Sequence, residues 1–184
     1  FEFYHDSVNS FQFKKDLITK AIVSSRPRGA VADDSTYDLA GIFLQDEVKL
    51  SEKLSAILGA RFNYARVDAN EIDPDPTDGY PFYPFTHSYK STVGSVRFSY
   101  KPRKSINLII GVSQGFRAPN LSDTTSFQDA KTSTVDVPAP DLKAEKSISY
   151  EVGAKVKEKK LEGALFWFYT DLSDFIRRVP TTYQ

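Results

Sequence analysis

The sequence predicts an all-β protein, namely an antiparallel up-and-down β-barrel that spans a membrane with its strands. The first observation is that four stretches of about ten residues alternate apolar and polar side chains. Between residues 92 and 101, for example, Val96, Phe98 and Tyr100 alternate with Arg97, Ser99 and Lys101. A period of two indicates a β-strand with two different faces. The second observation is that short basic turns and long polar loops join these stretches alternately, which is typical of outer-membrane barrels.

The length and polarity of the stretches fit a membrane better than an ordinary half-buried sheet. Ten residues at roughly 3.3 Å each, tilted by about 40°, cover roughly 25 Å, which is the height of the lipid-facing band of such barrels. A register shift of one residue would turn Arg97 and Lys101 towards hydrocarbon, at roughly 2 to 4 kcal/mol for each cation near the midplane. The alternation therefore determines which face of each strand meets lipid.

The other elements follow from the same alternation and from turn signals. Asp46 interrupts the apolar face of the expected strand 37–50. In the expected strand 106–117, Ile109 and Gln114 interrupt the division into an apolar and a polar face. Including the strand end at residues 1–5, about seven to eight strands are expected. Residues 6–36 form a polar segment with room for a short hairpin around residues 11–22. The predicted order continues with strand 37–50, turn 51–53, strand 54–67, loop 68–89, strand 92–101, turn 101–104, strand 106–117, loop 118–144, strand 147–157, turn 157–160 and strand 161–170.

Composition excludes several classes of protein. The 184 residues include 24 basic and 24 acidic side chains and no cysteine, so disulfide and thiolate metal sites are excluded and nucleic-acid binding gains no support. No apolar run approaches the roughly 18 residues of a transmembrane helix, which argues only against helical membrane proteins. The chain starts at Phe1 without methionine or a signal-like segment, and we expect an internal fragment with both ends truncated.

Aromatic residues in the strands predict the girdles that such barrels place at both membrane interfaces. A soluble β-sandwich with an aromatic core would show the same alternation and remains an alternative at this point. The residues assigned to the girdles are Tyr64, Tyr100, Phe116, Tyr150, Phe166, Phe168 and Tyr169.

Three phrases in the second half of the chain carry a family resemblance. They are Gly-Phe-Arg-Ala-Pro-Asn-Leu at 115–121, Pro-Asp-Leu-Lys-Ala-Glu-Lys-Ser at 140–147 and Tyr-Glu-Val-Gly-Ala-Lys at 150–155. In combination they resemble TonB-dependent outer-membrane receptors, and similar stretches extend the resemblance over most of residues 37–178. The resemblance implies a 22-stranded barrel closed by an amino-terminal plug, in the outer membrane of a Gram-negative type of envelope. Residues 1–184 would then form part of one barrel domain, with about a third of its strands, and the plug would lie outside this chain.

The resemblance also implies partners and a ligand. The partners would be outer-membrane lipid, the TonB system acting through the plug, and a scarce small-molecule nutrient, most often a ferric siderophore. Nothing in the residues selects a siderophore over cobalamin or an oligosaccharide. Haem is less expected, because the Phe116–Pro119 box is followed by no histidine before Leu142.

No catalytic site, cofactor or structural metal site is expected. The Gly-Val-Ser-Gln-Gly phrase at 111–115 matches a nucleophile elbow, but strand alternation continues through it and both histidines precede it. The Asp- and Pro-rich segment 73–79 fails the spacing of a calcium loop, although a weak divalent site there is an alternative to a solvated loop.

Candidate ligand-binding residues are Arg117 and Asn120 at the start of one long loop, and Tyr80, Phe82, Tyr83 and His87 in an aromatic loop. These aromatic side chains could equally pack that loop against its neighbours. Because Arg117 and Glu145 share the same parity at the long-loop end of one hairpin, we also expect them to form an ion pair facing the lumen.

Two other functions stay open on the sequence. One is a complete small outer-membrane barrel of about eight strands with an adhesin or structural role. The other is a secreted carbohydrate-binding β-sandwich.

Overall fold

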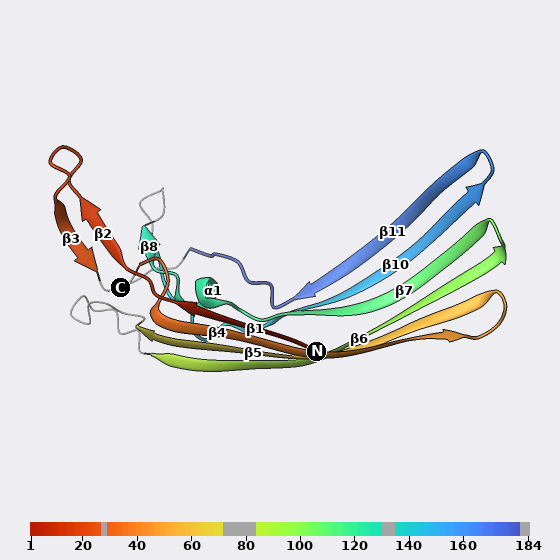
Figure 1. Cartoon of the computed structure of the whole chain (residues 1–184), viewed down its shortest axis with the longest axis horizontal. Coiled ribbons are helices and arrows are strands. Elements are labelled where there is room, and N and C mark those ends of the chain that lie inside the picture. Colours follow the sequence, from red (N-terminus) through yellow and green to blue (C-terminus); the bar gives the residue numbers. More distant parts are fainter. Residues whose placement is uncertain (27–28, 72–83, 130–134, 181–184) are drawn as a thin grey trace.

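The computed structural model describes residues 1–26, 29–71, 84–129 and 135–180. Seven strands form one antiparallel sheet in the order β1-β4-β5-β6-β7-β10-β11, so the strands follow one another up and down (Figure 1). This sheet confirms the predicted strand number and excludes a two-sheet sandwich. Its strands are β1 (Glu2–Val8), β4 (Asp33–Lys49), β5 (Leu54–Glu71), β6 (Phe85–Arg103), β7 (Ile106–Arg117), β10 (Glu145–Glu158) and β11 (Leu161–Ser173).

The remaining described elements are small and lie at the long-loop end of the sheet. They are the hairpin β2 (Gln12–Lys15) with β3 (Ile22–Arg26), the helix α1 (Leu121–Thr125), and the short pair β8 (Gln128–Asp129) with β9 (Val135–Asp136). The β2–β3 pair falls within the polar segment where a hairpin was predicted. In the described ranges, no helix has the length and apolar character needed to cross a membrane.

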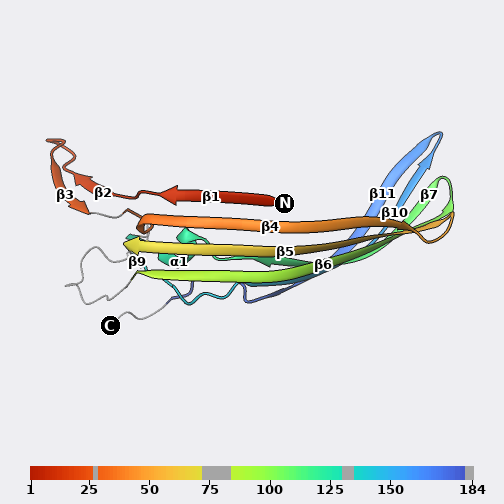
Figure 2. The same cartoon turned by 60° about the horizontal axis from the view of Figure 1, so that its bottom comes forward.

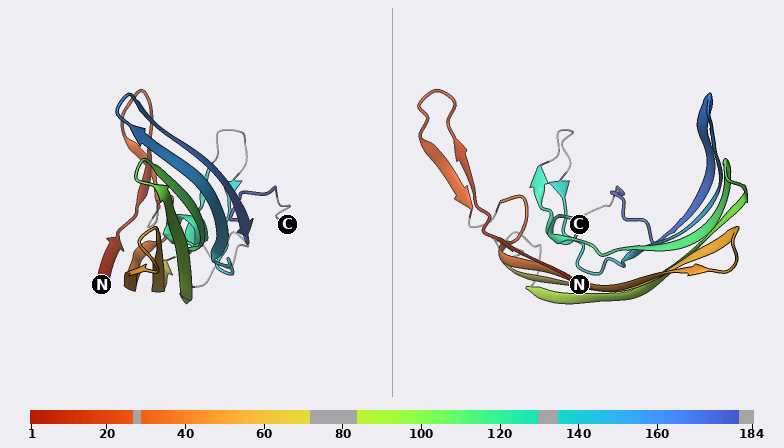
Figure 3. Two further views of the ribbon diagram at one scale, coloured as in Figure 1. Left: turned by 90° about the vertical axis from the view of Figure 1, so that its right-hand side faces the viewer. Right: turned by 45° about the vertical axis from the view of Figure 1, so that its right-hand side comes forward.

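Cross-strand pairing sorts the side chains onto two faces. Arg97 lies opposite Gly111, which in turn lies opposite Glu151, so these three positions share one face. The neighbouring positions Val96, Val112 and Tyr150 occupy the other face. The sheet is curved, and α1 lies on its concave side (Figure 3). We call the face of Arg97 and Glu151 the inner face and the face of Val96 the outer face.

Apart from β7, the strands of the main sheet are longer than the sequence predicted. β4, β5 and β6 contain 17, 18 and 19 residues, whereas β7 contains 12. His87 therefore lies on β6 and not in a loop, which corrects its predicted placement. The physical reason is that the inner face remains apolar beyond the membrane-spanning band, since Val67, Ala69 and Tyr89 are all buried there.

Burial at this end depends on α1 and its flanking residues. Ala65, Val67, Ala69, Tyr89 and Leu121 belong to one buried cluster. The backbone of the α1 region is tied to the start of β4, because Ala32 N donates to Thr125 Oγ1 at 3.0 Å and Phe127 N donates to Ala30 O at 2.9 Å. The segment after β7 thus folds onto the inner face and does not project away from it.

The three short turns lie side by side at the opposite end of the sheet (Figure 2). Lys101 N donates to Lys53 O at 2.7 Å, and Lys157 N donates to Ser105 O at 2.8 Å. The predicted alternation of short turns and long connections is therefore confirmed, with each kind gathered at its own end.

The ladder corrects part of the girdle assignment. Tyr150 lies opposite Tyr169 on the outer face, with ring centroids 6.4 Å apart. Phe166 lies opposite Gly153 and Phe168 opposite Glu151, so both phenylalanines share the inner face. Four consecutive aromatic residues, 166–169, must occupy both faces of a strand, which is why aromatic character alone misplaced them.

Candidate functional site

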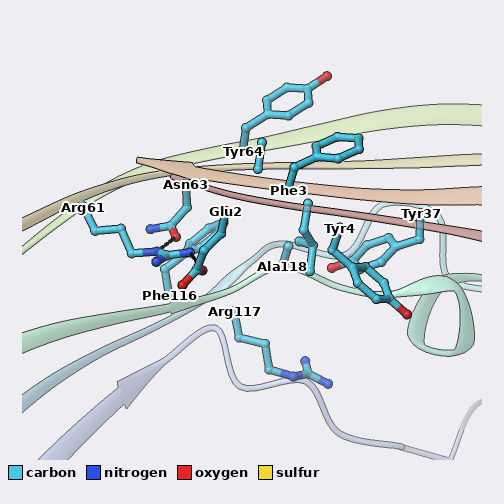
Figure 4. A pocket seen from close by; sticks show the side chains of 13 residues that line it. Glu2, Phe3, Tyr4, Tyr37, Arg61, Asn63, Tyr64, Phe116, Arg117 and Ala118 are labelled. Carbon is cyan, nitrogen blue, oxygen red and sulfur yellow. Dashed lines mark hydrogen bonds and ion pairs between the residues drawn. The ribbon is translucent and has the colours of Figure 1, made fainter. Parts of the chain in front are cut away.

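A pocket of about 350 Å³ lies on the inner face at the long-loop end. One wall comes from β1, β4 and β5, and the facing wall comes from the end of β7 and the residue after it (Figure 4). Phe3, Ala40 and Tyr64 also border it, and Figure 4 shows Phe3 and Tyr64 on the far side of the ribbons from Arg61 and Phe116. The inner-face lining includes Glu2, Tyr4, Tyr37, Leu39, Gly41, Arg61, Asn63, Phe116, Arg117 and Ala118.

Arg61 is held across two strands of the first wall. Its Nε donates to Asn63 Oδ1 at 2.7 Å, and its Nη2 donates to Glu2 Oε2 at 2.7 Å. To reach Glu2 from β5 the side chain crosses β4 at Gly41, where a Cβ would fall on the guanidinium. Glycine at this position therefore makes room for a fixed cation in the pocket.

Arg117 occupies the facing wall and contacts two carboxylates. Its Nη2 lies 2.9 Å from Asp123 Oδ2, and its Nη1 lies 3.6 Å from Glu145 Oε2. Asp123 Oδ2 also accepts from Asn120 N at 3.1 Å, and Glu145 Oε1 accepts from Ile176 N at 2.8 Å. Arg117 thus connects the ends of β7 and β10 with α1.

A half-buried phenol, Tyr37, and a buried one, Tyr89, lie beside this wall. The outer face next to them already carries Arg66 and Asp68, so they lie beyond the apolar membrane band. Burial raises the pKa of Tyr37, with Arg117 partly opposing this effect. The pKa of Tyr89 is raised to about 12. Burial is the largest cause, and the electrostatic effects of Tyr37, Asp123 and Asp141 act in the same direction. Both phenols are therefore neutral hydrogen-bond donors at physiological pH, and Tyr89 Oη donates to Leu142 O at 3.2 Å.

The predicted ligand-binding residues differ in whether they line the pocket. Arg117 lines the pocket, whereas Asn120 is the N-cap of α1, with its side-chain oxygen accepting from Asp123 N at 2.9 Å. The His87 ring packs against the Tyr89 ring at 4.5 Å between centroids and does not line the pocket. The other predicted ligand residues, Tyr80, Phe82 and Tyr83, lie outside the described residues.

Sequence reasoning missed most of the pocket. Period-two alternation puts Arg61 and Asn63 on the polar face of β5, but nothing local indicated that Glu2 and Tyr37 would join them. Asp123 was missed although a signal existed, because Asn120 and Asp123 have the spacing of a capping box.

A second cation crosses a strand nearer the short turns. Arg97 Nε on β6 lies 2.6 Å from Glu151 Oε1 on β10, on either side of Gly111 on β7. The geometry is that of an ion pair without an aligned hydrogen bond. In the parts of the chain that the structure describes, no cluster of three or more His, Cys, Asp or Glu residues could hold a metal ion.

Comparisons with known proteins agree with this architecture. A copper transporter, OprC, superposes with a TM-score of 0.68 at 20% identity, covering 90% of this chain and 25% of that one. The hemophore receptor HasR of Serratia marcescens, solved as a double mutant with its hemophore HasA and heme, superposes with a TM-score of 0.73 at 15% identity, covering 94% and 29%. The chain thus spans about a quarter of the length of these receptors. No curated protein matches it.

The family comparison covers nearly the whole chain. The family model described as TonB dependent receptor-like, beta-barrel matches residues 2–184. Members of this family reside in the Gram-negative outer membrane. The chain therefore belongs to the TonB-dependent receptors and forms part of their outer-membrane β-barrel.

Proposed function

We propose that the complete receptor takes up a scarce nutrient through the outer membrane, with a ferric siderophore as the leading ligand. Residues 1–184 would be part of one barrel domain, and energy would come from TonB through a plug elsewhere in the receptor. The small self-contained barrel becomes the weaker alternative, because β1 and β11 do not pair with each other and the sheet stays open.

The observation that carries this proposal is the inner-face pocket, whose lining includes one arginine from each wall, Arg61 and Arg117. A volume of about 350 Å³ lies within the range of roughly 300 to 1,000 Å³ that small-molecule sites occupy. Each guanidinium has five N–H donors, and the hydrogen bonds of Arg61 to Asn63 and Glu2 use only its Nε and Nη2 groups. The free donors and the aromatic rings suit an oxygen-rich ligand, which is the chemistry of hydroxamate and catecholate siderophores.

The carboxylates of the pocket set a limit on that ligand. Glu2 pairs with Arg61, while Asp123 and Glu145 contact Arg117, so the cations are positioned but already neutralised. A strongly anionic ligand would have to compete with these carboxylates. We therefore expect hydrogen bonding and ring contact to contribute more to binding than net charge does.

The test is uptake by cells that produce the complete receptor. A panel of radiolabelled ferric hydroxamate, ferric catecholate, cupric ion and haem would be supplied to cells with and without TonB. We expect TonB-dependent accumulation of one ferric siderophore. TonB-dependent uptake of copper or haem alone would reject the siderophore assignment, and TonB-independent accumulation of every compound would reject the transport mechanism.

Pocket variants connect uptake to this site. Tyr37→Phe removes a hydroxyl to which the described residues make no hydrogen bond, so it should leave the fold intact. Arg117→Gln removes the charge-assisted hydrogen bonds that the guanidinium would donate to the ligand. Their loss should cost roughly 1.5 to 3 kcal/mol, or about 10- to 150-fold in affinity. Lys155→Gln, on the inner face near the short turns, is the matched control and should bind normally. Unchanged binding by both pocket variants would place the ligand elsewhere.

A further inference from the structure

An apolar groove of about 520 Å³ lies on the outer face, in the half of the sheet nearest the short turns. Its volume is again that of a small-molecule site, but nearly all of its lining is hydrocarbon or aromatic. It crosses β6, β7, β10 and β11, and side chains that define it include Phe98, Tyr100, Leu108, Ile110, Val152 and Trp167.

Two basic turns border this groove. The β6–β7 turn carries Arg103 and Lys104, and the β10–β11 turn carries Lys159 and Lys160. All four side chains are exposed, and the turns are adjacent, because Lys157 N donates to Ser105 O. Among the described residues, none of the four takes part in an ion pair; Glu158 is the acidic side chain on the same face of this edge.

A β-bulge directs one of these cations to the outer face. Tyr100 pairs with Leu108, but the next pair towards the turn is Arg103 with Ile106, so β6 has one residue more than β7 between them. Ile106 and Leu108 share the outer face, and Arg103 therefore joins the face of the groove. Without the bulge, the arginine would have the opposite parity and face inward.

From this arrangement we propose that the groove and the basic turns form a binding site for an anionic phospholipid of the inner leaflet. Short turns of outer-membrane barrels lie on the periplasmic side, so the groove meets the acyl chains of that leaflet. One acyl chain fills the groove, and the phosphate lies against Arg103 with Lys104 or Lys159 beside it. Guanidinium groups bind phosphate oxygens in a bidentate manner, and clustered cations next to an apolar surface attract anionic lipid.

The experiment is native mass spectrometry of the complete receptor in detergent, titrated with phosphatidylglycerol or with phosphatidylcholine of the same acyl chains. We expect the receptor to retain phosphatidylglycerol preferentially. In the double variant R103Q/K104Q, retention of phosphatidylglycerol should fall by about five-fold for each charge removed. The control double variant K14Q/K15Q removes the same charge from β2 at the other end of the sheet and should retain the lipid normally.

Other results would overturn the proposal. Equal retention of the two lipids, or equal loss in the control variant, would mean that the lipid binds as an unspecific annulus. Tighter retention of lipid A than of phosphatidylglycerol would assign the surface to the outer leaflet. Glycerophosphoglycerol, which lacks acyl chains, should not be retained, and its retention would show that the groove contributes nothing. None of these results depends on the identity of the transported nutrient.

Discussion

Glycines on the inner face allow long side chains to cross from one strand to the next. Gly41 lies under Arg61, and Gly153 lies under the ring of Phe166. Gly111 separates Arg97 from Glu151, and a Cβ there would lie 3.3 Å from Glu151 Cγ. Because glycine has no Cβ, each position lets a cation or a ring lie flat across the backbone. The polar positions of the alternating sequence therefore provide contacts between side chains of different strands, as well as a face that meets water.

A pair of substitutions tests this role of glycine. A Cβ at Gly153 would fall on the Phe166 ring, whereas a Cβ at Gly163 meets nothing within 4 Å. Gly153→Ala should lower the free energy of unfolding of the complete receptor by about 1 to 3 kcal/mol, because the ring must move. Gly163→Ala should be neutral or stabilise by up to about 1 kcal/mol. Both values can be measured by guanidinium unfolding, and equal effects of the two variants would contradict the packing argument.

At the scale of elements, Gln114 interrupts the apolar face of β7, and a hydrogen bond to β6 explains why it is there. The ladder between β6 and β7 ends at the pair Ser95–Ser113. At the next step, Gly94 N donates to the side-chain Oε1 of Gln114 at 3.1 Å. The amide side chain thus supplies an acceptor at the point where the two strands separate, which a leucine or valine could not do.

Hydrogen exchange can test this contact. Gln114→Met keeps the length of the side chain but removes the acceptor, so the free energy that protects the Gly94 amide should fall by about 1 kcal/mol. We expect this amide to exchange about five-fold faster, with the protection of neighbouring amides on β5 unchanged. Gln45→Met on the inner face of β4 is the control and should not affect Gly94. Normal protection of Gly94 in the Gln114 variant would show that the strands do not need this bond.

At the scale of the whole molecule, the sheet has two unpaired edges, β1 and β11. Every residue of β11 is exposed, including Leu165, Trp167, Phe168 and Tyr169. An exposed, apolar edge strand is a template for pairing with another chain. Further strands must therefore pair with β1 and β11 for a closed barrel to span the membrane.

We expect the 184-residue chain to aggregate through these edges when it is refolded alone in detergent. The complete receptor, refolded identically, should remain monomeric in sedimentation experiments. The substitution Phe168→Pro removes a backbone donor from β11 and should slow aggregation of the isolated chain. A stable monomer of the isolated chain would contradict the open-barrel architecture and favour a small self-contained barrel.

Local pattern determined the strands, their facing and the order of short turns and long connections. These features depend on period-two alternation within single stretches, as in Val96, Arg97 and Phe98, and the structure confirms them. Parity also placed Arg117 and Glu145 at the same level of one hairpin, where they are direct partners in the ladder. Strand ends were less predictable, because burial of Val67 and Tyr89 by α1 extends β5 and β6 beyond the membrane band.

Only the tertiary structure decided which residues meet. The pocket joins Glu2, Arg61 and Arg117 from strands far apart in the sequence, and the bulge at Tyr100–Arg103 reverses the facing of a cation. Asp123 reaches Arg117 because the segment after β7 folds back onto the inner face. Alternation is a local property that the sequence by itself determines, whereas register, curvature and the path of a connection arise from packing between distant segments.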